Sequence, residues 1–326
     1  MKKYLALDAG GTKVAAILYD EDFRIIKTAV SGSLRENTTS ADLIEKHISE
    51  IIEALGLSSD DRIEIISGVC EGSLIERICN LCHVGKVAMT GEFDIGLSAA
   101  NIFGDGLLAL SGTGASLFGK YQGRNFSTGG YGASVSDEGS GYWTARQAFL
   151  AAIADDEERG PKTVLTDLIS EHFGFDRNKL GAAIFTIYGQ KNLSAVACVA
   201  RCAPLVTDAA KMGDEVALKI LKRAGELLGL QLLHVIRKNG IPSSVPATIS
   251  GNNWRGHRII FDEFKRVLLE QAPEREIIIP KFEPIIGVIL KHYHEIHGNI
   301  TEKIEKQFLT EYKDYTFNID KPKLRK

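Results

Sequence analysis

The stretch Leu107–Arg146 reads LLALSGTGASLFGKYQGRNFSTGGYGASVSDEGSGYWTAR and decides the fold. An apolar run breaks at Ser111–Gly114, an alternating strand follows over Ala115–Tyr121, and a second glycine-rich bend lies at Gly129–Gly132. A strand, a tight glycine turn and a second strand form a shape in which main-chain N–H groups can bind a phosphate. Glycine lets the anion approach the main chain. Two ordinary hairpins would have the same pattern, so one copy alone leaves both interpretations open.

The acidic segment Ser136–Gly141 follows the second bend, and a helix is expected to begin at Tyr142. We expect Asp137 and Glu138 in the first turn of that helix, where the helix dipole favours negative charge. A charged, exposed turn is expected after the helix, at Asp155–Gly160.

A second copy of the turn lies near the N-terminus. Leu5–Lys13 (LALDAGGTK) leads into Val14–Tyr19, just as Leu108–Gly114 (LALSGTG) leads into Ala115–Tyr121. Both copies are a Leu-Ala-Leu strand, a glycine–threonine turn and a strand. A repeat of this length indicates two related domains rather than a solenoid, whose repeats are shorter and more numerous. Two such hairpins, if they face each other, could hold one nucleotide polyphosphate.

Asp8 lies at the end of a buried strand, where a carboxylate is costly to desolvate unless it meets a cation or hydrogen-bond donors. Mg²⁺ beside a triphosphate would meet that need, and an Asx-turn is the structural alternative. Thr12 or Lys13 could contact phosphate oxygens. The turn does not fit G-x-x-x-x-G-K-[ST], and no G-x-G-x-x-G follows a strand, so the Walker and Rossmann motifs are excluded.

The composition is that of an ordinary globular chain of two domains. The chain has 326 residues, 44% of them hydrophobic and 25% charged. A net charge of −3 gives no electrostatic footprint for nucleic acid. No apolar run approaches the ~20 residues that span a membrane, and no signal peptide is expected before the first strand. We therefore expect a cytoplasmic protein with neither nucleic acid nor membrane as a partner.

The five cysteines are expected to be reduced, structural thiols, because a cytosolic chain rarely carries disulfides. Cys79 and Cys82 form a lone C-x-x-C. A zinc site would need a second pair or histidines at ligand spacing, and only His83 is near.

Strands alternate with helices in the first third of the chain, which indicates an α/β domain with ligands at the carboxyl ends of its strands. Glu92 and Asp94 follow the strand Val84–Met89. Either carboxylate could accept the proton of a sugar hydroxyl during phosphoryl transfer, or both could be first-turn acids of the next helix. Asn37, before the helix Ala41–Leu55, could hydrogen-bond a substrate hydroxyl or belong to the helix cap.

We expect three segments, joined near Gly104–Gly106. Residues 1–104 would form the N-terminal domain and residues 105–298 the C-terminal domain, including a last amphipathic helix at Pro284–His297. Residues 299–326 are polar with a basic end, and we expect a loosely held extension there.

Together, five motifs resemble those of the actin / sugar kinase / Hsp70 superfamily. They are DAGGTK (Asp8–Lys13), SGTGA (Ser111–Ala115), GGYGASVSDEGSGYWTARQA (Gly129–Ala148), ISGNNW (Ile249–Trp254) and PIIGVIL (Pro284–Leu290). Within the superfamily the set is similar to the N-acetylglucosamine kinases and the BadF/BadG/BcrA/BcrD-type ATPases, over residues 3 to about 297. The resemblance implies an α/β chain of two ribonuclease H-like domains of the actin-like ATPase fold with an interdomain cleft.

The resemblance also implies roles for individual residues. Those expected to bind ATP are Gly10, Gly11, Thr12, Lys13, Gly112, Thr113, Gly114, Gly251 and Asn252. Those expected to bind the sugar are Asn37, Gly130, Tyr131 and Asp137. Asp8 would hold the metal ion.

Two positions depart from the family pattern. The family's base is an aspartate in a Thr-Xaa-Asp run, and here Thr90-Gly91-Glu92 fills that place, with Asp94 as a rival. One extra methylene moves a base by more than about 1 Å, which matters for a geometry-sensitive transfer. Tyr131 replaces a tryptophan that lines the sugar pocket.

The function expected from the resemblance is that of a cytoplasmic, homodimeric sugar kinase that uses ATP and Mg²⁺. N-acetylglucosamine, phosphorylated at its 6-hydroxyl, is the expected substrate. One alternative is a BadF-type ATPase that activates a partner enzyme through an iron–sulfur cluster, for which only Cys79 and Cys82 could serve. The other is a sugar-sensing protein without catalysis, suggested by Glu92.

Overall fold

The computed structural model describes residues 1–36, 39–133, 135–189 and 194–321, and the chain divides into two compact units. Unit 1 consists of Met1–Gly104 and Ile279–Phe317. Unit 2 consists of Asp105–Ile278 and Asn318–Lys326. The first division thus falls at the expected glycine-rich joint, whereas the second does not coincide with the expected boundary at residue 298.

A five-stranded mixed sheet forms the centre of unit 1. Its strands are β1 (Lys3–Ala9), β2 (Lys13–Asp20), β3 (Ile25–Gly32), β4 (Arg62–Val69) and β5 (His83–Met89), in the order β3-β2-β1-β4-β5. β2 runs antiparallel to both β1 and β3, whereas β4 runs parallel to both β1 and β5. It follows that β1, β3, β4 and β5 all end at the same edge of the sheet.

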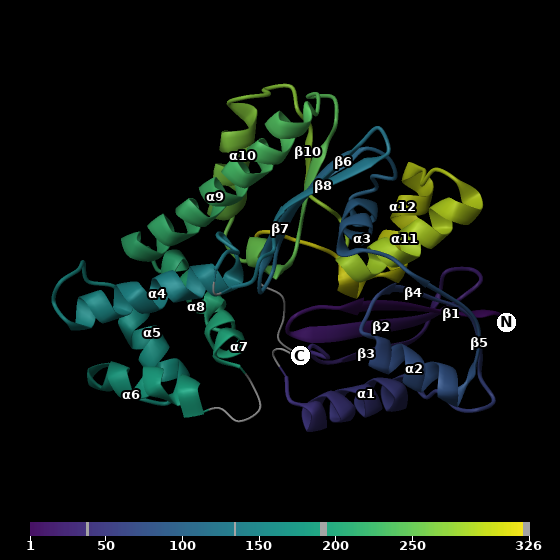
Figure 1. Cartoon of the computed structure of the whole chain (residues 1–326), viewed down its shortest axis with the longest axis horizontal. Helices are drawn as coiled ribbons and strands as arrows, with labels where there is room; N and C mark the ends of the chain where they lie inside the picture. The colour runs from purple at the N-terminus through teal and green to yellow at the C-terminus, as the bar shows by residue number, and fades with distance from the viewer. Residues whose placement is uncertain (37–38, 134, 190–193, 322–326) are drawn as a thin grey trace. The chain divides into compact units, whose positions relative to one another are not determined.

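Helices cover both faces of this sheet. α1 (Ala41–Leu55) and α2 (Gly72–Leu81) pack on one face, and α3 (Glu92–Ala99), α11 (Pro284–His297) and α12 (Glu302–Glu311) pack on the other. Successive side chains of a strand point to opposite faces, so each buried strand supplies both apolar cores. Figure 1 shows the late helices α11 and α12 beside α3, which comes almost two hundred residues earlier in the chain.

The segment Ile279–Phe317 belongs to unit 1. We had expected its first part in the C-terminal domain and the rest in a loosely held extension. A Cβ built on Gly287 of α11 would lie 2.0 Å from the carbonyl oxygen of Ile95 in α3, so these helices approach more closely than any other residue would allow. Phe308 and Tyr312 are buried, and the Tyr312 hydroxyl donates a 2.6 Å hydrogen bond to the Phe23 carbonyl. We expected a loosely held extension because α12 is mostly polar, and the polar sequence did not indicate that a few aromatic side chains would be buried.

The sheet of unit 2 repeats the topology of the first. Its strands are β6 (Gly106–Ser111), β7 (Ala115–Tyr121), β8 (Arg124–Gly129), β9 (Ala247–Ser250) and β10 (Ile277–Ile278). Their order is β8-β7-β6-β9-β10, with β7 antiparallel to β6 and β8, and β9 parallel to β6 and β10. The same order and the same directions confirm that the repeated turn motif marks two related domains.

The helices of unit 2 lie in the two connections that follow β8 and β9. In chain order they are α4 (Gly141–Asp156), α5 (Leu165–His172), α6 (Leu180–Phe185), α7 (Ala195–Ala200), α8 (Ala203–Lys211), α9 (Glu215–Asn239) and α10 (Ile259–Leu269). α9 and α10 pack side by side next to the sheet (Figure 1). Short 3₁₀ turns lie at Arg177–Lys179, Thr186–Gly189 and Asn252–Trp254, and a further one in unit 1 at Lys313–Tyr315.

Asp155 corrects the expectation of an exposed turn at Asp155–Gly160. α4 continues to Asp156, and the Asp155 side chain is fully buried. Its carboxylate accepts hydrogen bonds from the Thr166 hydroxyl at 2.7 Å and from Arg177 at 2.5 Å, and it lies 3.1 Å from the Lys162 ammonium. These partners stabilise the charge that would otherwise keep such a residue at the surface.

Candidate active site

The first glycine turn, Gly10–Thr12, joins β1 to β2 in unit 1. The Gly10 N–H donates to the Lys13 carbonyl at 2.8 Å, which closes the turn. The Ser33 hydroxyl, in the segment after β3, donates to the Gly10 carbonyl at 3.3 Å. The Lys13 ammonium lies 3.9 Å from the carboxylate of Glu283, which immediately precedes α11. The turn is thus supported from two other segments of the same unit.

Asp8 precedes this turn at the carboxyl end of β1. It is half-buried and pairs in register with Val69 of β4. Burial, together with the negative charges of Glu71 and Asp8, raises the pKa of the neighbouring Cys70 thiol to about 12. Cys70 is therefore a neutral thiol at physiological pH.

Glu92 and Asp94 both lie in the first turn of α3, after Gly91 at the N-cap. The Glu92 carboxylate pairs with the Arg35 guanidinium at 3.0 Å, and the Asp94 carboxylate accepts a 3.3 Å hydrogen bond from the Thr90 hydroxyl. Glu92 and Asp94 therefore have different partners, although they are separated by one residue. Both positions are compatible with helix-start acids and with a proton acceptor.

The topology gathers these residues at one edge of the unit 1 sheet. The first glycine turn, Gly10–Thr12, follows β1. Arg35 follows β3, Glu71 follows β4, and Glu92 follows β5. Because those four strands share one direction, their carboxyl ends meet at the same edge, which is where α/β sheets bind ligands. Asn37, the expected sugar-binding amide, lies outside the described residues.

The second glycine turn, Gly112–Gly114, joins β6 to β7 in unit 2. The Gly112 N–H donates to the Gly114 carbonyl at 2.9 Å. Two N–H groups at the start of α4 donate to the turn: that of Gly141 to the Gly112 carbonyl at 2.8 Å and that of Tyr142 to the Thr113 carbonyl at 3.2 Å. The N–H groups at the start of α4 therefore fix the second glycine turn through the carbonyl groups of that turn.

A hydrogen-bond network connects this turn with two distant segments. The buried Ser111 hydroxyl donates to the Gly139 carbonyl at 2.9 Å. The Asn253 amide donates to the Ser111 hydroxyl at 3.1 Å and to the Gly139 carbonyl at 2.9 Å. Gly251 has a φ of +102°, and a Cβ there would lie 2.3 Å from the Ser111 carbonyl oxygen. Only glycine permits this approach.

Sequence reasoning assigned Gly251 and Asn252 to ATP binding and missed the neighbouring Asn253. The ISGNNW motif was the available signal, but the hydrogen-bond partner of Asn253 lies 142 positions away. Trp254, at the end of the same motif, is fully buried and donates its indole N–H to the Ala109 carbonyl of β6 at 3.2 Å. This tryptophan anchors the motif to the strand that leads into the second turn.

We expected Asp137 in the first turn of α4, but it lies before the helix. The helix begins at Gly141, and the Ser140 hydroxyl caps it by accepting the Trp143 N–H at 3.1 Å. Asp137 adopts a φ of +58° before the helix, and a Cβ on Gly114 would lie 2.6 Å from its Oδ2 atom. The Asp137 carboxylate therefore lies against the second glycine turn.

Asp137 is buried, with 5% of the residue exposed. Burial raises its pKa, and main-chain hydrogen bonds from Gly132, Ala115 and Gly130 oppose that rise. Its Oδ1 atom has no hydrogen-bond partner among the described residues. Tyr131, in the same bend, is 76% exposed. The segment from the second glycine-rich bend to α4 therefore carries a buried acceptor, Asp137, and a largely exposed aromatic residue, Tyr131.

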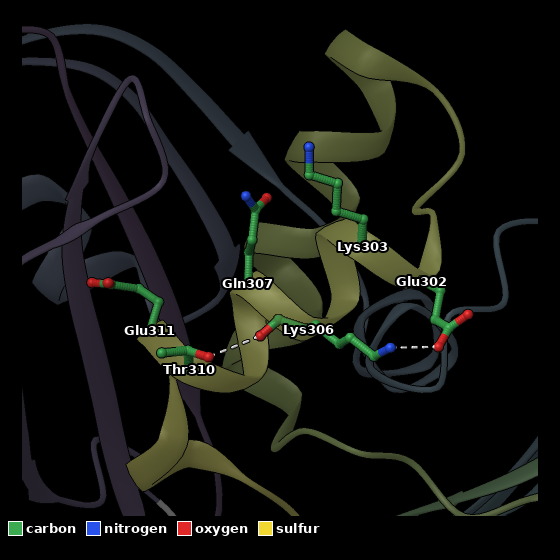
Figure 2. A pocket seen from close by; sticks show the side chains of 6 residues that line it. All are labelled: Glu302, Lys303, Lys306, Gln307, Thr310 and Glu311. Atoms are coloured by element: carbon green, nitrogen blue, oxygen red, sulfur yellow. Dashed lines mark hydrogen bonds and ion pairs between the residues drawn. The ribbon is translucent and has the colours of Figure 1, made fainter.

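A hollow of about 670 Å³ on α12 includes none of the predicted site residues (Figure 2). It is lined by Glu302, Lys303, Lys306, Gln307, Thr310 and Glu311. Lys306 pairs with Glu302 at 2.7 Å, and the Thr310 hydroxyl donates to the Lys306 carbonyl at 3.0 Å. Both contacts lie within one helix, whereas ligand sites are mostly apolar pockets in which a few polar groups converge.

Within the described parts of the chain, His, Cys, Asp and Glu side chains form no group of three or more that could hold a metal ion. Nucleotide-bound Mg²⁺ usually takes one or two carboxylates together with phosphates and water. The half-buried Asp8 at the strand end fits that requirement. No described helix is both long enough and apolar enough to cross a membrane.

Residues 5–291 match the family model described as the BadF/BadG/BcrA/BcrD ATPase family. The chain is 26% identical over 304 residues to the N-acetylmuramic acid/N-acetylglucosamine kinase of Clostridium acetobutylicum, covering 89% of this chain and 98% of that one. It is also 26% identical over 314 residues to the N-acetyl-D-glucosamine kinase of Dictyostelium discoideum, covering 88% and 96%.

Solved structures agree on the fold. A structure from Chromobacterium violaceum proposed to be an N-acetylglucosamine kinase gives a TM-score of 0.62 at 19% identity, covering 89% of this chain and 98% of that one. A ROK family glucokinase from Streptomyces griseus, in complex with glucose and AMPPNP, gives 0.54 at 15% identity, with coverages of 88% and 97%. These similarities show that both units have the fold of the sugar kinases.

Proposed function

Because the chain belongs to the BadF/BadG/BcrA/BcrD ATPase family, we propose that it phosphorylates N-acetylglucosamine at the 6-hydroxyl. Its relatives establish the broader activity, which is ATP-dependent phosphoryl transfer to an amino sugar. The observation that carries the proposal is the repeated sheet, in which each copy has a glycine–threonine turn between its first two strands. A cytoplasmic homodimer is part of the same proposal.

We assign both glycine turns to the phosphates of ATP. Phosphoryl transfer needs the phosphates to be oriented and their charge to be neutralised, and glycine-rich turns with exposed N–H groups can do both. The proposed ATP-binding residues are Gly10, Gly11, Thr12, Lys13, Gly112, Thr113, Gly114, Gly251 and Asn252. Gly251 and Asn252 would lie beside adenine, because the network of Ser111 and Asn253 fixes their segment against the second turn.

Asp8 would hold Mg²⁺, which supplies positive charge to the phosphates when it is bound. The sugar would be bound by Asn37, Gly130, Tyr131 and Asp137. For Asp137 the support is its buried Oδ1 atom, which has no hydrogen-bond partner among the described residues and could accept one from a hydroxyl group. Tyr131 supports an apolar contact with one sugar face, because its ring is largely exposed.

Glu92 is the proposed proton acceptor, with Asp94 as its rival. A carboxylate at the start of a helix and at the carboxyl edge of a sheet can accept a hydroxyl proton as the phosphoryl group transfers. Replacing the true acceptor by its amide should lower kcat by about 10²–10⁴-fold. Glu92→Gln is expected to show that loss, and Asp94→Asn a much smaller one, in initial rates of ADP release.

The proposal is tested by incubating the purified protein with Mg-ATP and a panel of N-acetylated and free hexosamines. We expect ADP release that depends on N-acetylglucosamine, with ³¹P NMR showing a 6-phosphate product. Release with a different sugar would correct the substrate and keep the kinase. No sugar-dependent release across the panel would overturn the kinase proposal.

Sugar sensing without catalysis is the second candidate, favoured by the glutamate that stands where the family has an aspartate. It predicts that N-acetylglucosamine raises the melting temperature while ADP release stays at the level of protein without sugar. Ligand-induced stabilisation and ADP release, measured on the same sample, separate the two candidates.

A further inference from the structure

We propose that Arg35 is a positioning residue that holds the Glu92 carboxylate in the orientation needed to accept the sugar proton. This role rests on the proposed kinase function. Arg35 Nη2 lies 3.0 Å from Glu92 Oε1, and Arg35 Nε lies 3.7 Å from Glu71 Oε1. One guanidinium therefore joins segments that follow β3, β4 and β5. Its planar donors hold both carboxylates in fixed directions, whereas a lysine ammonium is a compact charge with rotatable donors.

The main chain of Arg35 is fixed to the first glycine turn. The Arg35 N–H donates to the Ser33 hydroxyl at 3.1 Å, and that hydroxyl donates to the Gly10 carbonyl at 3.3 Å. A chain of contacts therefore runs from the proposed phosphate-binding turn through Ser33 and Arg35 to Glu92. The position of the proposed base is set relative to that turn within a single unit of the fold.

A glutamate needs such a partner more than an aspartate does. Glu92 has one more rotatable bond than an aspartate, so its carboxylate samples more positions unless a contact restrains it. The Glu92 and Arg35 side chains are 35% and 40% exposed. An ion pair at that exposure adds little to folding stability, so the consequence of losing it should fall on geometry. Asp94 is restrained separately, by the Thr90 hydroxyl at 3.3 Å.

A double-mutant cycle tests this role in the full chain. The variants are Arg35→Met, Glu92→Gln, Asp94→Asn and the two double variants that include Arg35→Met. We expect Arg35→Met to lower kcat for N-acetylglucosamine by about 10–100-fold, the cost of misplacing a reacting group by roughly 1 Å. The KM for ATP should change by less than about 2-fold, since uniform binding of ATP is not affected.

The effects of Arg35→Met and Glu92→Gln on kcat should be strongly non-additive, whereas those of Arg35→Met and Asp94→Asn should be additive. Adding Arg35→Met to Glu92→Gln should lower kcat no further, because the positioned group is already absent. Adding Arg35→Met to Asp94→Asn should lower kcat by the same factor as Arg35→Met does in the wild type. Arg35→Lys, which keeps the charge without the planar fork, should restore part of kcat. If Glu92→Gln leaves no measurable rate, the same cycle is run with Glu92→Asp.

Arg62→Met is the matched control. Arg62 Nε lies 3.0 Å from Glu64 Oε1 in the same unit, but near the opposite end of β4. We expect its kcat and melting temperature to equal those of the wild type. Equal effects of Arg35→Met and Arg62→Met, additive losses with Glu92→Gln, or a loss of activity explained by a lower melting temperature would each overturn the role of Arg35. Wild-type protein without sugar-dependent ADP release would instead overturn the kinase function, and with it this role.

Discussion

Asp137 is a buried acidic residue whose proposed sugar-binding role needs a charge that folding disfavours. Burial raises the pKa of its carboxyl group, so the folded protein binds the proton more tightly than the unfolded chain does. The stabilising contribution of the protonated form is complete below the ordinary pKa of 3.8 and is lost as pH rises through the folded-state pKa. At neutral pH the charged form therefore opposes folding at this position.

Replacing Asp137 by asparagine should separate stability from sugar binding. The amide keeps one oxygen for the main-chain donors and removes the buried charge, so the melting temperature at pH 7 should not fall. The KM for the sugar should rise about 10-fold or more, because a hydrogen bond to a charged acceptor is lost. Thermal scans and initial rates measure the two effects. A lower melting temperature with an unchanged KM would assign Asp137 a structural role only.

Gly251 should be irreplaceable for two reasons that a control can separate. Gly251→Ala adds a methyl group at a φ of +102° and 2.3 Å from the Ser111 carbonyl oxygen, so the segment must move. Gly123→Ala is the control, because Gly123 has a φ of +75° but open space around it. Strained backbone costs about 1–3 kcal/mol at either site. Chemical denaturation should show that cost for both variants and a larger loss for Gly251→Ala, and only Gly251→Ala should also raise the KM for ATP.

At the scale of elements, the buried charge of Asp155 joins the end of α4 to the segment before α5 and to the 3₁₀ turn at Arg177. Burial raises the pKa of Asp155, but hydrogen bonds from Thr166, Lys162 and Arg177 outweigh that effect and lower the pKa from 3.8 to about 2. A lowered pKa gives stability that is present above pH 3.8 and is lost as pH falls toward 2. The pKa shift of Asp155, and with it the pH dependence of stability, is opposite in sign to that of Asp137.

Asp155→Asn should destabilise unit 2 by about 1.5–3 kcal/mol at pH 7, the usual range for hydrogen bonds to a charged group. The difference from wild type should shrink between pH 3.8 and about 2. Asp167→Asn is the matched control: Asp167 also pairs with Arg177, at 2.6 Å, but its side chain is 43% exposed. Denaturation at several pH values measures both. Equal losses for the two variants would contradict the importance of burial.

α12 is held to unit 1 by its buried aromatic residues. Phe308 is 5% exposed, and removing its ring leaves a cavity among the aromatic side chains around Phe23 and Tyr312. Phe308→Ala should therefore cost about 3–5 kcal/mol. Phe185→Ala is the control, since that ring is 74% exposed and should cost less than about 0.5 kcal/mol. A small loss for Phe308→Ala would support the original expectation of a loosely held extension.

These elements show which features a sequence can predict. Strands and glycine turns follow local patterns, so the α/β fold and the repeat of its first turn could be predicted from the sequence. α12 and Asp155 were not, because a polar or charged segment indicates exposure unless its distant partners are known. The Arg35–Glu92 pair and the Ser111–Asn253 hydrogen bond join residues 57 and 142 positions apart. Such pairs depend on strand order, which local periodicity does not contain.

At the scale of the whole molecule, two related domains repeat one topology, and each presents a glycine–threonine turn after its first strand. The two turns share a Leu-Ala-Leu strand and a glycine–threonine pair, and the proposed phosphate binding would require glycine in both. The segments between the strands differ greatly in length, and the proposed sugar-binding and base residues come from those segments. This division places the proposed phosphate contacts in the repeated turns and the proposed sugar contacts in the variable segments.

Sugar-dependent ADP release by the wild-type protein and by Glu92→Gln measures both the proposed kinase activity and its proposed base. With Mg-ATP and N-acetylglucosamine, the wild type should release ADP in equal amounts to the sugar 6-phosphate formed. Glu92→Gln should be slower by about 10²–10⁴-fold with a similar melting temperature. A wild type that releases no ADP with any hexosamine, or a Glu92→Gln variant as fast as the wild type, would contradict the account.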